Sequence, residues 1–214
     1  SVEEIMKILI NRFLVVLLLF AISNSITAQS VEIGPRLTGN LNIFNMERLT
    51  GTWNGVGIGI GGTTDISFSQ NIGIITNLTF FDMKNFSNES TNNNITTETT
   101  LSVAYITIDP LFKAEFSGFY LVGGFSLGIK ISSSGEQTQS VINQNPTVQT
   151  LNLNTNSMKF DLAFGTGYNF YLSPTMALAP DFMMYIPLTD TYDIPGSSNS
   201  SLTLKLGASL KFRI

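Results

Sequence analysis

The chain has 214 residues, a formal net charge of −4 and only 12% charged residues, which excludes the basic face that nucleic-acid-binding proteins need. We therefore expect no nucleic-acid partner. The absence of cysteine and histidine also excludes a disulfide framework and every catalytic mechanism that needs a histidine base.

A signal peptide is predicted over residues 1–28. Met6, Lys7 and Arg12 form a basic start, residues 13–22 are apolar, and 23–28 form a small, polar exit before cleavage. The alternative is a membrane-anchoring helix, but this apolar stretch is too short to span a bilayer. Residues 1–5 precede Met6 and are interpreted as an upstream start or added residues. We expect one mature, exported domain over 29–214.

Eight β-strands are predicted after the signal peptide, because apolar and polar residues alternate with a period of two. The clearest is the last strand, 202–214, in which every second residue from Leu202 to Ile214 is apolar. The other predicted strands are 31–44, 55–68, 72–85, 97–113, 119–132, 158–172 and 176–189. Alternation is poor in 72–85, where Ile74-Ile75 and Phe80-Phe81 are apolar on both faces. Strands of this length with one apolar face can cross a bilayer at a tilt.

The predicted connections alternate between short and long. The short turns are 69–71, 114–118 and 173–175, and the long polar loops are 45–54, 86–96, 133–157 and 190–201. In an antiparallel meander this order places all short turns at one end, as in bacterial outer-membrane barrels. The sequence therefore predicts an all-β fold, an eight-stranded antiparallel up-and-down transmembrane β-barrel.

The region from about Ser30 to Ile214 resembles the outer-membrane β-barrel proteins of Bacteroidetes, the PorT-like group. The resemblance is carried by four segments: Tyr105–Lys113, Phe119–Phe125 with its Gly-Gly pair, Phe164–Tyr168 and Leu178–Asp181. It implies eight antiparallel strands with both ends in the periplasm and a location in the cell outer membrane. The implied partners are outer-membrane lipid and the outer-membrane assembly machinery. The family favours a terminal aromatic residue, whereas this chain ends in Ile214.

If the apolar faces point to lipid, the opposite faces point into the lumen and form a polar network there. Its predicted members are Glu32, Arg36, Asp109, Lys113, Lys130, Lys159, Asp161, Asp181, Lys205, Lys211 and Arg213. Eight strands enclose a space just wide enough for side chains, so we expect these charges to pair and fill it. A narrow ion path or a small-ligand pocket is the alternative.

Neither a catalytic residue, a cofactor site nor a metal site is predicted. Asp161 and Asp181 are expected on neighbouring strands, but in a lysine-rich lumen two acids are expected to form ion pairs. Trp53, Tyr171 and Tyr192 could form an interfacial aromatic belt, or reflect the usual enrichment of aromatics in strands.

The leading functional hypothesis is a non-enzymatic outer-membrane barrel that stabilises the envelope or presents surface loops for binding to a ligand that the sequence does not identify. Two alternatives stay open. One is a small pore or a carrier for a small or hydrophobic solute. The other is a secreted, lipocalin-like ligand-binding barrel with its apolar faces turned inward.

Overall fold

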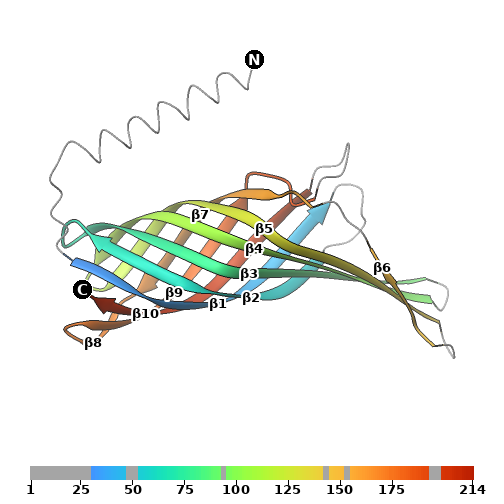
Figure 1. The fold of residues 1–214 in the computed structure, drawn as a ribbon, viewed down its shortest axis with the longest axis horizontal. Coiled ribbons are helices and arrows are strands. Elements are labelled where there is room, and N and C mark those ends of the chain that lie inside the picture. Colours follow the sequence, from blue (N-terminus) through green and yellow to red (C-terminus); the bar gives the residue numbers. More distant parts are fainter. Residues whose placement is uncertain (1–29, 47–52, 93–94, 142–144, 152–154, 193–198) are drawn as a thin grey trace, which may run out of the picture.

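The computed structural model describes residues 30–46, 53–92, 95–141, 145–151, 155–192 and 199–214 (Figure 1). The predicted signal peptide, residues 1–28, lies outside the described residues. In the described part of the chain, no helix combines the length and the apolar character needed to cross a membrane.

Eight long strands close into a ring in which every neighbouring pair is antiparallel (Figure 1). They are β1 (Ser30–Met46), β2 (Trp53–Ser67), β3 (Ile72–Asn92), β4 (Ile95–Phe116), β5 (Phe119–Val141), β7 (Met158–Tyr168), β9 (Met176–Pro187) and β10 (Asn199–Arg213). They follow one another in chain order, and β10 pairs back with β1. Two short strands complete the sheet: β6 (Thr147–Thr150) pairs with β5, and β8 (Phe170–Ser173) pairs with β9. The predicted all-β, eight-stranded antiparallel barrel is confirmed.

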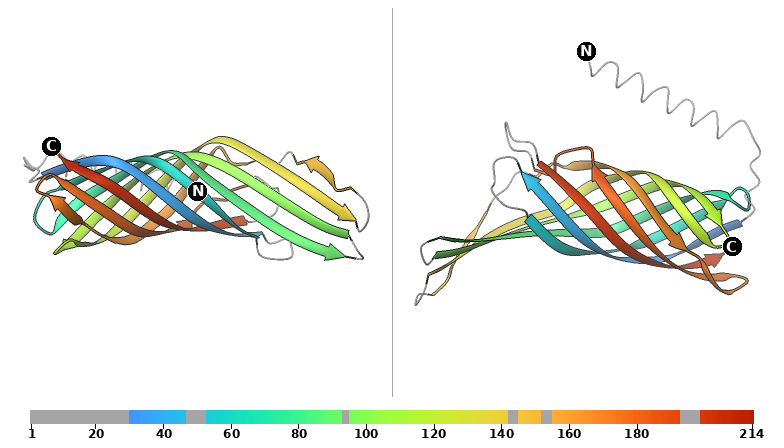
Figure 2. Two further views of the ribbon diagram at one scale, coloured as in Figure 1. Left: turned by 90° about the horizontal axis from the view of Figure 1, so that it is seen from below. Right: turned by 180° about the vertical axis from the view of Figure 1, so that it is seen from behind.

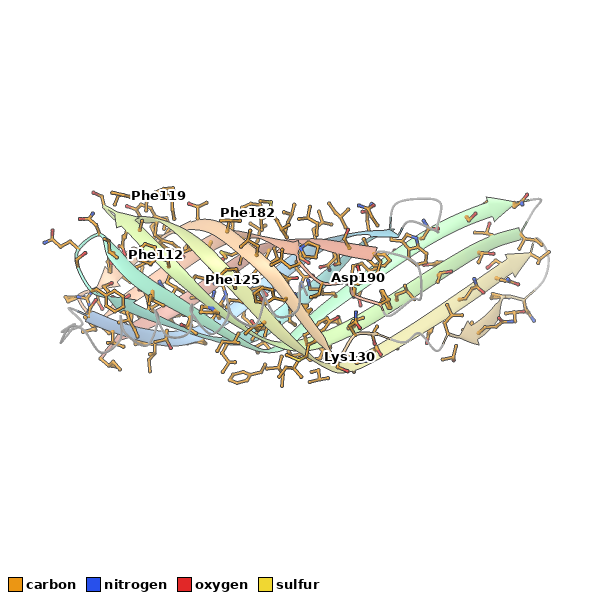
Figure 3. All side chains as sticks on the ribbon, turned by 90° about the horizontal axis from the view of Figure 1, so that it is seen from above. Phe112, Phe119, Phe125, Lys130, Phe182 and Asp190 are labelled. Carbon is orange, nitrogen blue, oxygen red and sulfur yellow. The ribbon has the colours of Figure 1, made fainter. Side chains whose placement is uncertain are left out.

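The apolar faces of the strands point outward and the polar faces point inward. Leu37 and Val56 are 62% and 69% exposed, whereas Asp65 and Lys205 are each only 2% exposed. Many of the large exposed side chains are phenylalanines of the outer wall, four of which are labelled in Figure 3: Phe112, Phe119, Phe125 and Phe182. An apolar wall around a closed sheet is the surface that membrane barrels turn to lipid. The lipocalin-like alternative requires the opposite orientation and is wrong.

The short turns gather at one end of the barrel, together with the start of β1 and the C-terminus (Figure 1). The tightest joins β4 to β5 through Ser117 and Gly118, whose φ angles are 53° and 88°. Positive φ at both central residues is what a two-residue type I′ hairpin requires. We call the opposite end of the barrel the mouth.

Two of the predicted long polar loops, 86–96 and 133–157, are largely strand. β3, β4 and β5 continue past the mouth and, with β6, form a sheet that extends beyond the barrel (Figures 1 and 2). We call residues 87–92, 95–100, 136–141 and 147–150 the projecting sheet. Across its four strands, Ser87 is opposite Thr100, Thr100 is opposite Glu136, and Glu136 is opposite Thr150. These segments carry no apolar alternation, but threonine favours strands and the backbone ladder holds them.

A β-bulge in β3 explains the poor alternation of its sequence. The register against β4 shifts between Thr79 and Asp82, so β3 holds one extra residue there. Phe80 and Phe81 are therefore both turned outward, with 59% and 37% of their surfaces exposed. After the bulge, Asp82 and Lys84 face the lumen.

Two apolar clusters lie inside the barrel between the polar groups. The mouth cluster contains Phe44, Trp53, Phe86, Leu101, Val103, Tyr105 and Tyr192. The middle cluster contains Ile75, Leu111, Tyr120, Val122, Ala163, Met183 and Tyr185. An interfacial belt is therefore the wrong interpretation for Trp53 and Tyr192, which are 6% and 2% exposed. Tyr171, on β8, is 53% exposed.

Candidate functional site

The inward residues of β10 contact polar groups along the whole length of the lumen. Alternate residues of this strand, from Thr203 near the mouth to Arg213 at the short-turn end, each contact a partner from another strand, with the exception of Gly207. The partners, in that order, are Lys84 on Thr203, Asp82 on Lys205, Arg36 on Ser209, Asp65 on Lys211 and Glu32 on Arg213. The period of two that turns one face to lipid thus turns a ladder of donors and acceptors inward.

Asp65 is the centre of the ladder at the short-turn end. Its Oδ1 lies 2.6 Å from Lys113 Nζ and its Oδ2 lies 2.7 Å from Lys211 Nζ. Lys113 Nζ also lies 2.8 Å from Glu115 Oε2. Each of these side chains except Glu115 is 2% exposed, so the charges are compensated by one another rather than by water.

Arg36 and Asp181 form a two-point ion pair in the middle of the barrel. Arg36 Nη2 donates to Asp181 Oδ1 at 2.7 Å, and Nη1 donates to Oδ2 and, at 3.2 Å, to Ser209 Oγ. This fork geometry is the strongest arrangement for a guanidinium and a carboxylate. Gly207 faces the pair, and the absence of a side chain there leaves the space that the pair occupies.

Three lysines lie between this pair and the mouth. Lys205 Nζ contacts Asp82 Oδ2 at 2.9 Å, Lys159 pairs with Asp161, and Lys84 donates to Thr203 Oγ1. Aromatic rings support these cations. Lys205 Nζ lies 4.7 Å from the centroid of the Tyr185 ring, and Lys159 Nζ lies 5.5 Å from that of Tyr105.

The structure places nine of the eleven sequence-predicted network residues in ion pairs and two in other contacts. The paired residues are Glu32, Arg36, Lys113, Lys159, Asp161, Asp181, Lys205, Lys211 and Arg213. Asp109 instead accepts a hydrogen bond from the Tyr185 hydroxyl at 2.8 Å. Lys130 lies at the mouth, where its Nζ donates to the carbonyl and hydroxyl oxygens of Thr155 at 2.6 and 2.8 Å.

Asp161 and Asp181 lie on neighbouring strands, β7 and β9, but do not face each other. In register, Asp161 is opposite Pro187 and Asp181 is opposite Gly167. Each carboxylate is held by its own cation, Lys159 or Arg36. The two do not form the close pair that carboxylate catalysis needs.

Sequence reasoning missed four members of the network: Asp65, Asp82, Lys84 and Glu115. The alternation did not identify Asp82 and Lys84 because of the bulge in β3. Odd-numbered residues of β3 face the lumen before the bulge, and even-numbered residues face it after the bulge. Asp65 and Glu115 lie near strand ends. Both have the inward parity of their strands, two residues from Thr63 and Lys113, and this parity could have identified them.

Apart from Lys130, which lies at the mouth, the charges of the network balance. Its acids are Glu32, Asp65, Asp82, Asp109, Glu115, Asp161 and Asp181, and its bases are Arg36, Lys84, Lys113, Lys159, Lys205, Lys211 and Arg213. Seven acids therefore face seven bases. Two cavities among these side chains each measure about 10 Å³, which is room for one water molecule.

Inside the barrel, the mouth is lined by aromatic groups. The Phe44 ring lies 5.2 Å from that of Phe86 and 5.3 Å from that of Tyr192, measured between centroids. Tyr192 follows β9, outside the spanning strands, and burial raises the pKa of its hydroxyl. Among the described residues, no three acidic side chains come together as a metal site would require.

Comparison with known proteins identifies the family. The model of the outer membrane protein beta-barrel domain matches residues 27–193, well over half of the chain. The chain belongs to this family. It is accordingly an outer-membrane protein, in agreement with the closed ring and its apolar outer wall. No curated protein matches the chain.

Solved structures of other outer-membrane proteins match the chain at low identity. Ail, the attachment invasion locus protein of Yersinia pestis, is 15% identical, with a TM-score of 0.39 over 85% of this chain and 98% of its own. OprG from Pseudomonas aeruginosa is 10% identical, with a TM-score of 0.44 over 87% and 97%. A major outer membrane protein from Thermus thermophilus is 11% identical, with a TM-score of 0.43 over 84% and 99%. These likenesses are too distant to bear on function.

Proposed function

We propose that this protein is a non-enzymatic outer-membrane barrel that presents the projecting sheet at the cell surface for binding. The observation that carries the proposal is the combination of a lumen filled by paired charges with a sheet that extends past its mouth. The barrel would act as a stable membrane support, and the sheet would make the contacts.

The filled lumen favours a supporting role over a conducting one. An eight-stranded barrel has little internal space, and here it is occupied by ion pairs and two apolar clusters. A conducting passage needs continuous water, whereas the two cavities described above each have room for about one water molecule.

The direction of the sheet supports surface presentation. In bacterial barrels the short turns lie on the periplasmic side and the long connections lie outside the cell. The Ser117-Gly118 hairpin and the C-terminus are at one end, and the projecting sheet is at the other (Figure 1). We further propose membership of the PorT-like group, with outer-membrane lipid and the assembly machinery as partners.

Cysteine labelling of intact cells tests the orientation, because the natural chain contains no cysteine. Val148→Cys places one thiol on β6 of the projecting sheet, and Asn71→Cys places one in the turn between β2 and β3. A membrane-impermeant maleimide is expected to label Val148→Cys on intact cells, and Asn71→Cys only after the outer membrane is permeabilised. The reverse pattern would overturn surface presentation.

Planar-bilayer recording tests the closed lumen. The purified protein is expected to give no stepwise current above background. As a control, Arg36→Ala combined with Asp181→Ala removes both partners of the central ion pair and enlarges the lumen at Gly207. Reproducible current steps from the natural protein, changed in size by this double substitution, would favour the pore alternative.

A further inference from the structure

The outer edge of β6 has no strand beside it in the described part of the chain. β6 pairs with β5 alone, with Thr150 opposite Glu136 and Thr147 opposite Gln139. All four of its residues are exposed, and Val148 is 61% exposed although it is apolar. The strand lies at the margin of the projecting sheet (Figure 1). Such an edge offers backbone N–H and C=O groups to an additional strand.

β6 lacks most of the features that protect natural sheet edges. Protected edges carry a lysine, a proline or a bulge within the strand, or are very short. The sequence of β6 is Thr-Val-Gln-Thr, without charge, and its register against β5 is regular. Its length and Pro146, directly before it, limit pairing, so a strand added here gains few backbone hydrogen bonds. A partner therefore needs side-chain contacts as well.

One face of the projecting sheet supplies charge for such contacts. Glu89 and Glu98 are directly opposite each other on β3 and β4. Glu98 is opposite Thr138 on β5, and Glu136 lies two residues from Thr138 on the same face. The projecting sheet contains no lysine or arginine, and among the described residues none of the three glutamates forms an ion pair.

This arrangement leaves an acidic face with an unfavourable internal interaction, and positive charge nearby would reduce it. Like charges directly opposite one another across two strands are destabilising. Val148 and Thr150 of β6 are opposite Thr138 and Glu136, so they lie on the same face as the glutamates. Strands are about 4.8 Å apart, so a side chain from a strand beside β6 reaches toward Glu136 across one intervening strand.

We propose that the β6 edge binds an extended segment of another protein as an added strand, with lysine or arginine at alternate positions over the glutamate face. This inference rests on the proposed function, since it needs the projecting sheet to lie outside the cell. Alternation matters because side chains of a strand reach one face only at every second residue. A second copy of this chain fits less well, because joining two β6 edges brings two acidic faces without a base into one sheet.

Peptide binding to the full-length protein in zwitterionic nanodiscs tests the proposal. The probe is a fluorescent synthetic peptide of about eight residues, one strand in length, that alternates lysine with valine. Fluorescence anisotropy is expected to show binding that weakens as salt screens the charges. The matched peptide with glutamate in place of lysine is expected not to bind.

Substitutions then separate the edge from the charge. Glu136→Gln is expected to weaken binding by about twofold to fivefold, the range of exposed charge pairs. Glu98→Gln is expected to have a smaller effect, because β4 lies three strand spacings, about 14 Å, from the added strand. Replacing Thr147–Thr150 by Gly-Ser-Gly-Ser removes the strand-forming side chains and is expected to abolish binding. Asp190→Asn removes the same charge at an exposed position outside the projecting sheet and is the matched control, with binding unchanged.

Each outcome decides the proposal. Equal binding of both peptides, or binding that survives the replacement of β6, would overturn it. Heat-modifiable gel migration shows whether each variant still contains a folded barrel, so a loss of binding is attributed to the sheet alone. If Val148→Cys is labelled on intact cells and the lysine peptide does not bind, the inference fails while the proposed function stands.

Discussion

At the scale of single residues, the barrel is stable because inward charged side chains have oppositely charged partners and enough space to contact them. A buried charge without a partner is costly, and breaking a buried pair costs more than replacing the whole pair by apolar groups. Asp65 forms ion pairs with both Lys113 and Lys211, so it compensates more buried charge than any other acid among the described residues. Inward glycines, such as Gly207 beside Arg36, provide the space.

Asp65→Asn is expected to lower the free energy of unfolding by about 3–5 kcal/mol, because it leaves Lys211 and part of the Lys113 charge uncompensated. Urea unfolding in lipid vesicles measures this, with Trp53, the single tryptophan, as the fluorescent probe. Adding Lys211→Met to the variant removes one unpaired cation and is expected to recover part of the loss. A change below about 0.5 kcal/mol, typical of surface substitutions, would contradict the role of Asp65.

Gly207→Ala is expected to destabilise the barrel by about 1–3 kcal/mol through overpacking. A Cβ at this position would lie 2.4 Å from Arg36 Nη2 and 2.7 Å from Asp181 Oδ1. Gly39 provides a matched control, because a Cβ there has no atom within 4 Å. The same urea titration is expected to leave Gly39→Ala close to the natural protein, and equal effects of the two substitutions would refute the packing argument.

At the scale of elements, β3, β4 and β5 each belong to two structures. The first parts of β3 and β5 and the last part of β4 line the barrel, where one face of each strand is apolar. The remaining parts of these strands belong to the projecting sheet, where both faces are polar. The barrel part is stabilised by lipid on one side and by the lumen network on the other. The projecting part depends on strand pairing alone, so it is expected to be the less stable of the two.

Shortening the β3–β4 hairpin tests this independence. Ser87 and Thr100 are opposite each other, so joining them by an Asn-Gly turn removes residues 88–99 and retains a regular hairpin. The barrel is expected to fold, with unchanged heat-modifiable migration. Residues 136–150 lose their partner strand and are expected to become sensitive to protease. Loss of the folded barrel would show that the projecting sheet is required for assembly.

At the scale of the whole molecule, closure of the ring removes the free edges of its strands and separates two electrostatic regions. The lumen network is balanced, whereas Glu89, Glu98 and Glu136 lie on the projecting sheet. Asp190 and one base, Lys130, lie near the mouth (Figure 3). Among the described residues, the end that we propose faces the exterior therefore carries more acidic groups than basic ones. That field attracts a basic partner and repels an acidic one.

A cross-link between the first and last strands tests closure. Leu37 and Ala208 are opposite each other on β1 and β10, and both point outward. In the cysteine-free chain, Leu37→Cys with Ala208→Cys is expected to form a disulfide on mild oxidation of the folded protein. Leu37→Cys with Leu121→Cys on β5 is the control and is expected not to cross-link. Failure of the first pair under conditions that keep the barrel folded would indicate an open sheet.

Much of the fold follows from the sequence because a strand with one apolar and one polar face repeats every two residues. Leu202 to Ile214 shows this without interruption, and the structure places β10 there, with Leu206 exposed and Lys205 buried. The same period identified most inward charges. It identified neither the partners of those charges nor the strands of the projecting sheet, where both faces are polar and no apolar period exists.

The sequence by itself determined that the chain forms long two-faced strands and which of their faces is polar. Only the tertiary structure decided which inward groups meet, because partners such as Arg36 and Asp181 are 145 residues apart and are brought together by closure. It also decided where along β3 the inward-facing residues change from odd-numbered to even-numbered, since the bulge at Phe80-Phe81 depends on the register of β3 against its neighbours. Local alternation is a property of one strand, whereas register and closure are properties of all eight together.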